Sequence, residues 1–404
     1  MKSRQPAHTT GNDHWAALTA SFLGWTLDAF DFFLVVFSLT AIAKEFHQPD
    51  KAVALSITLT LAFRPVGAFL FGLMADRYGR RLPLMIDLIF YSVVEVATGF
   101  APNFTTFLIL RALFGIGMGG EWGVGASLAM EKVPAKWRGF LSGLLQQGYA
   151  LGNLLAALCY LFLFQRWGWR PLFFLGGLPA LLALFVRFRV KESEVWEKSK
   201  GESWGQLGGA LTKQWKLFIY MALLMTGMNL ASHGTQDMYP TFLQRFWNFG
   251  TVERSTISAI SMVGAIFGGI IIGSVSDRIG RRKAIVISLL LAIVVTPLWA
   301  YAPQVTLLIL GAFLMQFFVQ GAWGVIPAHL SELCPNEIRG FMPGFAYQCG
   351  VLLAGSVGYI EAVFAEHVSY ATAMALTAGS VFAGAALITA LGREHKGMEF
   401  GNVP

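Results

Sequence analysis

Apolar runs of about 20 residues alternate with short polar segments along the whole chain. A helix of that length matches the hydrocarbon core of a bilayer, which is about 30 Å thick. A β-barrel would instead show short segments of alternating polarity. The pattern predicts an all-α membrane protein with twelve membrane-spanning helices, at residues 15–43, 52–74, 84–101, 105–130, 140–164, 169–188, 215–244, 255–276, 284–301, 305–330, 341–365 and 370–391.

The seventh of these runs carries a polar stripe. Successive residues of a helix turn by about 100°, so its polar members fall within an arc of roughly 140°. Unpaired polar groups cost several kcal/mol each in hydrocarbon, so the stripe must face protein or an aqueous cavity. Either these groups hold neighbouring helices together or they line a central cavity, and the one-turn spacing of a histidine and an aspartate favours the cavity. The stripe consists of Asn229, Ser232, His233, Gln236 and Asp237.

Composition agrees with a membrane location. Charged residues make up 13% of the chain and hydrophobic residues 55%, whereas a soluble domain carries about 25% charged residues. The amino-terminal residues are polar and lack an apolar signal core, so we expect that this end stays in the cytoplasm. Three scattered cysteines give neither a metal-ligand spacing nor a disulfide framework, so no metal and no cofactor is expected.

The distribution of positive charge predicts the orientation. Most of the 30 lysines and arginines fall in loops and tails that are cytoplasmic if both termini lie inside. The net charge of +7 is therefore explained by topology and does not indicate nucleic-acid binding. We expect a multi-pass protein of the plasma or inner cell membrane, embedded in the lipid bilayer. Arg64 and Arg111 are exceptions, because both lie within predicted spans.

The chain contains an internal repeat. The segment Gly72–Arg81 recurs as Gly273–Arg282, 201 positions later, and both copies contain Asp-Arg-x-Gly-Arg-Arg. Repeats of this kind are typical of transporters. They predict two pseudo-symmetric six-helix bundles, residues 1–190 and 215–404, joined by a charged cytoplasmic linker at 191–214. This design needs no partner chain, so we expect a monomer. The same offset relates Trp122, Glu131, Arg138 and Gly139 to Trp323, Glu332, Arg339 and Gly340.

The repeated turns are candidates for gating. Asp76 and Asp277 can accept hydrogen bonds from the starts of neighbouring helices or from Arg138 and Arg339. Such contacts would hold the cytoplasmic side closed and break as the halves rock; the alternative is a static, solvated loop. The predicted gating residues are Gly72, Asp76, Arg77, Arg80, Arg138, Asp277, Arg278, Arg281 and Arg339.

The turns resemble the G-x-x-x-D-R-x-G-R-R signature of the major facilitator superfamily, and the likeness covers essentially the whole chain. The resemblance implies a transporter with one aqueous cavity between its halves, opened alternately to each side. The sequence has no nucleophile motif, phosphate loop or metal cluster, so we do not expect an enzyme. A membrane sensor would need a soluble signalling domain, which we do not expect from the short tails.

Ionisable groups within the spans are concentrated in the first half. Buried charges of opposite sign must pair, so we expect Asp28 or Asp31 to be the counter-ion of Arg111. Proton symporters of the superfamily, which the chain resembles, pair an acid of the first span with this arginine. That favours Asp31 as the proton carrier, with a permanent structural pair as the alternative. The candidate proton-coupling residues are Asp28, Asp31, Arg111, Glu121 and His233.

Arg64 is the candidate anion receptor, because its guanidinium can hold a carboxylate through two hydrogen bonds. Glu95 or an acid of the first span could occupy it instead. The pattern N-x-x-S-H-x-x-Q-D-x-x-x-T, which ends at Thr241, resembles the signature of fungal-type lactate and pyruvate proton symporters, within the sialate symporter branch. The Q-x-x-N pattern common there on the eleventh span is reduced to Gln348. The predicted substrate-binding residues are Arg64, Asn229, His233, Gln236, Asp237, Tyr347 and Gln348.

The resemblance implies proton-coupled import of short-chain monocarboxylates such as lactate or pyruvate. An anion entering an inside-negative cell opposes the membrane potential at about 2.3 kcal/mol per 100 mV, and a co-transported proton removes that cost. The alternative is a symporter for sialic acid or another larger organic acid. The ligands expected are therefore a small organic anion and a proton.

Overall fold

The computed structural model describes residues 13–199, 204–237, 239–355, 364 and 367–401. This part of the chain is almost entirely helical and contains no strand. The first group of helices consists of α1 (Asp13–Glu45), α2 (Asp50–Tyr78), α3 (Arg81–Gly99), α4 (Phe104–Lys132), η1 (Ala135–Trp137), α5 (Arg138–Cys159), the π-helical turn η2 (Tyr160–Phe164), α6 (Gln165–Trp167), α7 (Arg170–Leu175) and α8 (Leu178–Arg189).

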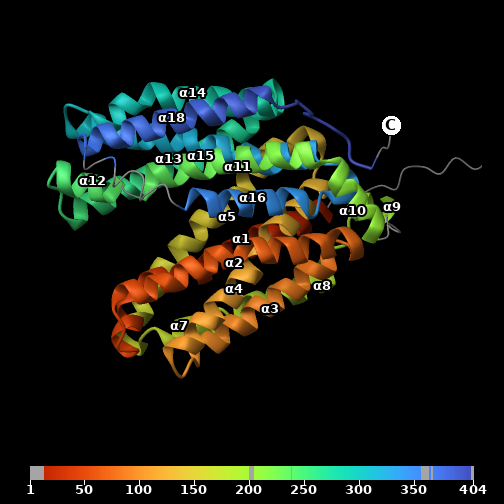
Figure 1. Cartoon of the computed structure of the whole chain (residues 1–404), viewed down its shortest axis with the longest axis horizontal. Helices are drawn as coiled ribbons and strands as arrows, with labels where there is room; N and C mark the ends of the chain where they lie inside the picture. Colours follow the sequence, from red (N-terminus) through yellow and green to blue (C-terminus); the bar gives the residue numbers. More distant parts are fainter. Residues whose placement is uncertain (1–12, 200–203, 238, 356–363, 365–366, 402–404) are drawn as a thin grey trace, which may run out of the picture.

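Two short helices, α9 (Glu194–Ser199) and α10 (Trp204–Lys213), follow within the predicted linker. The second group consists of α11 (Trp215–Gln236), α12 (Tyr239–Phe246), α13 (Thr251–Ile279), α14 (Arg281–Ala300), α15 (Val305–Leu333), η3 (Asn336–Ile338), α16 (Met342–Ala354) and α18 (Tyr370–Leu391). Figure 1 shows the two groups side by side, with α9 and α10 together at one end of the molecule. We call that end the linker end.

Among the described residues, ten helical segments are long and apolar enough to cross a membrane. The seventh and eleventh predicted crossings correspond to α11 and α16. The predicted crossing 341–365 extends past α16 into residues outside the described part of the chain. The predicted fold class, an all-α membrane protein built from two helical bundles, is confirmed.

The seventh crossing differs from the prediction. Residues 215–244 form two helices, because α11 ends at Gln236 and α12 begins at Tyr239. Pro240 has no N–H to donate to the carbonyl of Gln236, and proline is tolerated in the first turn of a helix, so a new helix starts here. Thr241, the last position of the predicted motif, therefore belongs to α12 and not to the helix that carries the polar stripe.

The sequence repeat is also a repeat in three dimensions. A Cβ atom added to Gly67 of α2 would collide with the carbonyl oxygen of Ile116 in α4. In the second half, a Cβ atom on Gly268 of α13 would collide with the carbonyl oxygen of Phe317 in α15. Both pairs keep the offset of 201, so each half packs the same two helices backbone to backbone through a glycine.

The halves meet through α5 against α13 and α2 against α16. Glycines again allow the close approach: an added Cβ on Gly143 would collide with the carbonyl of Gly269, and the Cα atom of Gly344 lies 2.7 Å from a Cβ added to Gly123. Helix packing of this kind brings buried groups of both halves to one shared interface.

Candidate functional site

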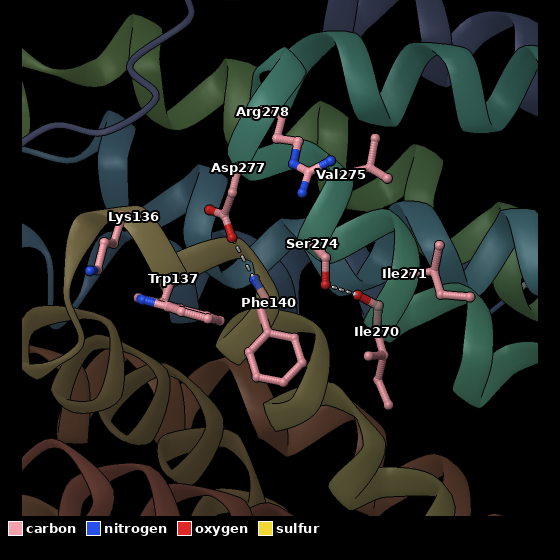
Figure 2. Close-up of a pocket in the computed structure, with 9 residues that line it drawn as sticks. All are labelled: Lys136, Trp137, Phe140, Ile270, Ile271, Ser274, Val275, Asp277 and Arg278. Carbon is pink, nitrogen blue, oxygen red and sulfur yellow. Dashed lines mark hydrogen bonds between the residues drawn. The ribbon is translucent and has the colours of Figure 1, made fainter.

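The two repeated aspartates join the halves at the linker end. The carboxylate of Asp76, on α2, accepts hydrogen bonds from the backbone N–H groups of Gly340 and Phe341, at 2.8 and 3.0 Å, just before α16. Asp277, on α13, does the same at the start of α5, also at 2.8 and 3.0 Å. Figure 2 shows its carboxylate directed at the backbone of Phe140. Of the two arrangements predicted for these aspartates, the structure has the one that uses helix starts.

Glu131 extends this contact in the first half. It accepts a hydrogen bond from Arg80 at 2.9 Å and lies 3.6 Å from Arg339 of the second half. Arg80 also binds Asp76 at 2.7 Å. Burial lowers the pKa of the Arg80 guanidinium, but Glu131 and Asp76 more than offset this effect, so its pKa lies above the usual value.

Glu332 occupies the equivalent place in the second half. It accepts hydrogen bonds from Arg281 at 2.9 Å and from Arg138 of the first half at 2.8 Å. The ring of Phe400, near the carboxyl end, lies 3.9 Å from the Arg138 guanidinium. The prediction did not include Glu131 or Glu332 among the gating residues, although their repetition at the offset of 201 was visible in the sequence.

The other predicted gating residues occupy the same end. A Cβ atom on Gly72 would lie 2.8 Å from the Cα atom of Phe341, so only glycine allows this approach of the halves. Arg77 is half-buried and Arg278 is exposed. Arg278 borders a surface hollow of about 530 Å³ between α5 and α13, together with Lys136 (Figure 2).

Arg64 lies buried in α2 at the interface of the halves, with 4% of its surface exposed. Its Cζ atom is 5.6 Å from the centre of the Tyr347 ring, which belongs to α16 of the other half. Its Nε and Nη2 atoms have no hydrogen-bond partner among the described residues. The carboxyl groups of Asp28 and Glu121 lie within its electrostatic reach. A buried guanidinium with free donors can hold a carboxylate through two hydrogen bonds.

Aromatic rings surround Tyr347. Its ring centre lies 4.6 Å from that of Trp122, 5.7 Å from that of Trp323 and 6.4 Å from that of Trp25. The indole of Trp122 donates to Gln146. The buried Nε1 of Trp25, in contrast, has no partner in the described part of the chain. Trp25 is therefore a further candidate donor to a ligand, and the prediction did not include it.

The buried acids of the first half pair differently from the prediction. Arg111 donates to Glu95 through both terminal nitrogens, at 2.6 and 3.3 Å, and not to Asp31. The side chain of Glu95 is longer than that of aspartate and reaches both terminal nitrogens from α3, while the Nε atom of Arg111 has no partner among the described residues. Asp28, Asp31 and Glu121 are fully buried, and their carboxyl oxygens have no hydrogen-bond partner among the described residues. The predicted pairing of Asp31 with Arg111 is therefore wrong.

Some members of the polar stripe of α11 hold neighbouring helices together, and others face the other half of the molecule. Ser232 accepts a hydrogen bond from Gln320 of α15 at 2.9 Å, and Gln236 donates to Gln316 of the same helix at 3.0 Å. These two members of the stripe hold helices of the second half together. Asn229 is buried and donates to the carbonyl of Met225 one turn earlier, at 2.7 Å.

The other two members, His233 and Asp237, form the predicted pair. The Nδ1 atom of His233 lies 3.1 Å from the Asp237 carboxylate, and the two side chains are 40% and 53% exposed. Asp237 lies within electrostatic reach of Tyr149 on α5 of the first half. The ring of Tyr149 is in turn 5.4 Å from that of Trp25. This part of the stripe therefore faces the other half of the molecule.

Gln348, on α16, is fully buried between the halves. Its Nε2 atom donates to the carbonyl of Gly119 at 3.4 Å, and its Oε1 atom has no partner among the described residues. The structure thus brings Arg64, Tyr347 and Gln348 together at the interface, with Asp237 closer to the end opposite the linker.

Comparisons with known proteins identify the family of this chain. The family model described as Major Facilitator Superfamily matches residues 21–250. The chain belongs to this superfamily. A second model, described as Sugar (and other) transporter, matches residues 215–392. The protein is therefore a membrane transporter of this type and not an enzyme.

Several proteins that are similar to this transporter are named for the transport of organic acids or related compounds. A carboxylic acid transporter protein homolog of Saccharomyces cerevisiae is 30% identical, covering 91% of this chain and 66% of that protein. A probable 4-methylmuconolactone transporter of Cupriavidus pinatubonensis is 32% identical over 88% of this chain and 85% of its own length. The sialic acid transporter NanX of Escherichia coli is 30% identical, with 94% of each chain covered.

Among solved structures, the proton:xylose symporter XylE superposes with a TM-score of 0.81 over 96% of this chain and 98% of its own. Its sequence identity to this transporter is 19%, so the likeness concerns the fold alone.

Proposed function

We propose that this transporter is a proton-coupled symporter that imports small monocarboxylates, with lactate and pyruvate as the first candidates, by alternating access. The observation that carries the proposal is Arg64, a buried guanidinium at the interface of the halves with two unpaired donor atoms. A buried charge of this kind needs an anion, and a carboxylate fits the two donors. The names of the similar proteins, which include transporters of carboxylic and sialic acids, support an organic acid.

The buried acids near Arg64 are the proposed carriers of the coupled proton. Asp28 and Glu121 share the electrostatic surroundings of Arg64, and neither makes a hydrogen bond within the described part of the chain. Ionising an unpaired buried carboxyl costs several kcal/mol, so these groups are suited to hold protons. Asp31 remains a proton-carrier candidate without Arg111, and His233, held by Asp237, remains a second one.

The contacts at the linker end supply the alternating access. We take this end as cytoplasmic, as the distribution of lysine and arginine predicts, and place the protein as a monomer in the plasma or inner cell membrane. The hydrogen bonds of Asp76 and Asp277 then hold the cytoplasmic side closed in this structure. Their release would let the halves rock and open the site of Arg64 inward.

A second candidate is a larger or planar organic acid. The ring of Tyr347 lies beside Arg64, and the rings of Trp25 and Tyr149 continue from it. Together they offer flat apolar surfaces to an unsaturated or aromatic acid. Related proteins are named as transporters of cis,cis-muconate and of niacin. The same guanidinium would bind the carboxylate in either case.

The test is transport by purified protein in liposomes. Counterflow of radiolabelled lactate is measured against unlabelled lactate, pyruvate, acetate, nicotinate, muconate and N-acetylneuraminate, while a dye reports the internal pH. We expect lactate and pyruvate to compete and lactate entry to acidify the lumen. Competition by nicotinate or muconate alone would favour the second candidate. Lactate transport without proton movement would refute proton coupling.

A further inference from the structure

The first half contains a further buried acid, on a different helix from Asp28 and Glu121. Asp87 lies on α3, is fully buried, and neither of its carboxyl oxygens has a hydrogen-bond partner among the described residues. The acid is visible in the sequence as one charged position in an apolar run. Figure 1 shows α3 on the side of the first helix group that is turned away from the second group. The helix α3 packs against α4, α8, α7 and α2, which all belong to the first half.

The packing of α3 against α4 places Asp87 beside Glu121. A Cβ atom on Gly117 of α4 would lie 2.5 Å from the Cβ atom of Tyr91 on α3, so the two helices touch at this point. The helices run in opposite directions, and Asp87 and Glu121 each lie one turn from this contact towards the linker end. The two carboxyl groups are electrostatic neighbours.

The packing of α1 against α4 places Asp28 on the other side of Glu121. A Cβ atom on Gly24 would collide with the Oε1 atom of Glu121. Asp28 lies one turn beyond Gly24, away from the linker end. Across the contact of α3 with α4, Asp87 is level with Glu121. At a rise of 1.5 Å per residue, Asp87 lies about 9 Å from the start of α3, which is at the linker end. The three acids thus lead from the neighbourhood of Arg64 through α4 to the part of α3 that lies nearer the linker end.

We infer that Asp28, Glu121 and Asp87 form a proton relay inside the first half, which carries the coupled proton from the neighbourhood of Arg64 to the linker end. The inference rests on the proposed function. In each step the protonated carboxyl gives its proton to the next carboxylate and becomes a carboxylate itself. The hydroxyl of Tyr91 is buried, has no hydrogen-bond partner in the described part of the chain, and is an electrostatic neighbour of all three acids. It can therefore bridge distances longer than one hydrogen bond.

Asp87 is surrounded by other acids, a tyrosine and apolar side chains. The groups facing it are Glu121 from α4, Asp28 from α1 and the Tyr91 hydroxyl on its own helix. From α2, Arg64 faces the other two acids. The helix α8, which also packs on α3, contributes apolar side chains to this core, namely Leu182, Ala183 and Val186.

The second half lacks this series. At the offset of 201, Asp87 corresponds to Ser288, whose hydroxyl donates to the carbonyl of Phe318 at 2.8 Å. Glu121 corresponds to Ala322, which is fully buried. A polar residue at this place in the repeat can therefore be satisfied by the neighbouring helix, as Ser288 is, whereas Asp87 is not. Ser288→Ala is accordingly the matched control for a change at Asp87.

The experiment compares wild type, Asp87→Asn, Asp87→Glu and Ser288→Ala in liposomes. Radiolabelled lactate is followed in two modes: counterflow at equal pH, which requires no net proton release, and accumulation driven by a proton gradient. We expect Asp87→Asn to keep counterflow and lose accumulation, Asp87→Glu to restore accumulation, and Ser288→Ala to keep both. Infrared difference spectra of purified protein should also lose one protonated-carboxyl band in Asp87→Asn.

Accumulation by Asp87→Asn at the wild-type level would overturn the relay, and so would an unchanged infrared spectrum. If Asp87→Asn does not fold, Tyr91→Phe takes its place, with slowed accumulation and unchanged counterflow as the expected result and wild-type accumulation as the contrary one. If wild-type vesicles neither exchange nor accumulate lactate, the proposed function fails, and the infrared band alone still decides whether Asp87 holds a proton.

Discussion

Replacing Asp76 by asparagine should open the linker end. The carboxylate of Asp76 joins α2 of the first half to the start of α16 in the second half through two backbone hydrogen bonds, at 2.8 and 3.0 Å. Asparagine keeps one acceptor oxygen and loses the charge and the second acceptor. An arrangement in which α2 and α16 separate lacks these bonds, so the substitution weakens only the closed arrangement and should shift the equilibrium towards the open one.

The size of the expected shift can be worked out from the strength of a hydrogen bond to a charged carboxylate. A hydrogen bond to a charged group contributes about 1.5–3 kcal/mol. The substitution removes the equivalent of one such bond, and every 1.4 kcal/mol changes an equilibrium constant about tenfold. We therefore expect the ratio of open to closed molecules to rise roughly 10- to 150-fold. Asp277→Asn, which weakens the equivalent contact at α5, should have a similar effect.

The assay is a distance measurement between spin labels at Leu82 and Lys283, which start α3 and α14 and are related by the offset of 201. Both side chains are exposed. The labels are attached to cysteines in a background without the three native ones. Glu45→Gln is the control, because Glu45 pairs with Arg170 of its own half at 2.8 Å. A wild-type distance distribution in Asp76→Asn would show that this carboxylate does not hold the halves together.

Three further predictions concern the site and the buried acids. Arg64→Lys keeps the charge and loses the two-pronged donor, so KM for the transported acid should rise about tenfold or more, as measured by initial uptake rates. Trp25→Phe removes the unpaired indole donor and should raise KM with little change in Tm. Glu95→Gln leaves Arg111 without its carboxylate, which should destabilise the protein by about 3–5 kcal/mol and lower its Tm, whereas Asp31→Asn should not.

Unchanged uptake by Arg64→Lys would remove the guanidinium from the binding site. Trp169→Phe is the control for Trp25→Phe: its buried indole donates to Glu45, away from the rings around Tyr347, so its loss should lower Tm and leave KM unchanged. Equal loss of Tm in Glu95→Gln and Asp31→Asn would show that the observed ion pair does not distinguish the two acids.

The sequence predicted the fold because its strongest signals are local or repeated. Bilayer-length apolar runs specify helices whatever their neighbours, and the repeat at an offset of 201 specifies two similar halves. The glycine contacts of Gly67 and Gly268 follow from that repeat. The repeat also brought Asp76 and Asp277 into correspondence, which is why their shared role at the linker end was predictable before the helix starts that they contact were known.

Side-chain pairing was less predictable, because it depends on helix rotation and reach. Arg111 could pair with any acid of the first half, and only the packing of α3 against α4 selects Glu95. The stripe of α11 posed the same difficulty, since sequence periodicity gives one polar face but not its neighbours. Gln236 faces a glutamine of α15, whereas Asp237, the next residue, faces the other half of the molecule.

The two unpaired acids near Arg64 determine whether proton binding raises or lowers the affinity for the substrate. When Asp28 and Glu121 are ionised, they compete with the substrate carboxylate for the guanidinium; when they are protonated, the positive charge of Arg64 is free to attract an anion. Proton binding should therefore precede substrate binding, and the apparent affinity for lactate should rise as the external pH falls. A carboxylic acid of pKa near 3.5 stays ionised above pH 5, so the effect cannot come from the substrate. Glu121→Gln should make the affinity less dependent on pH, and a wild-type affinity that falls on acidification would refute this order.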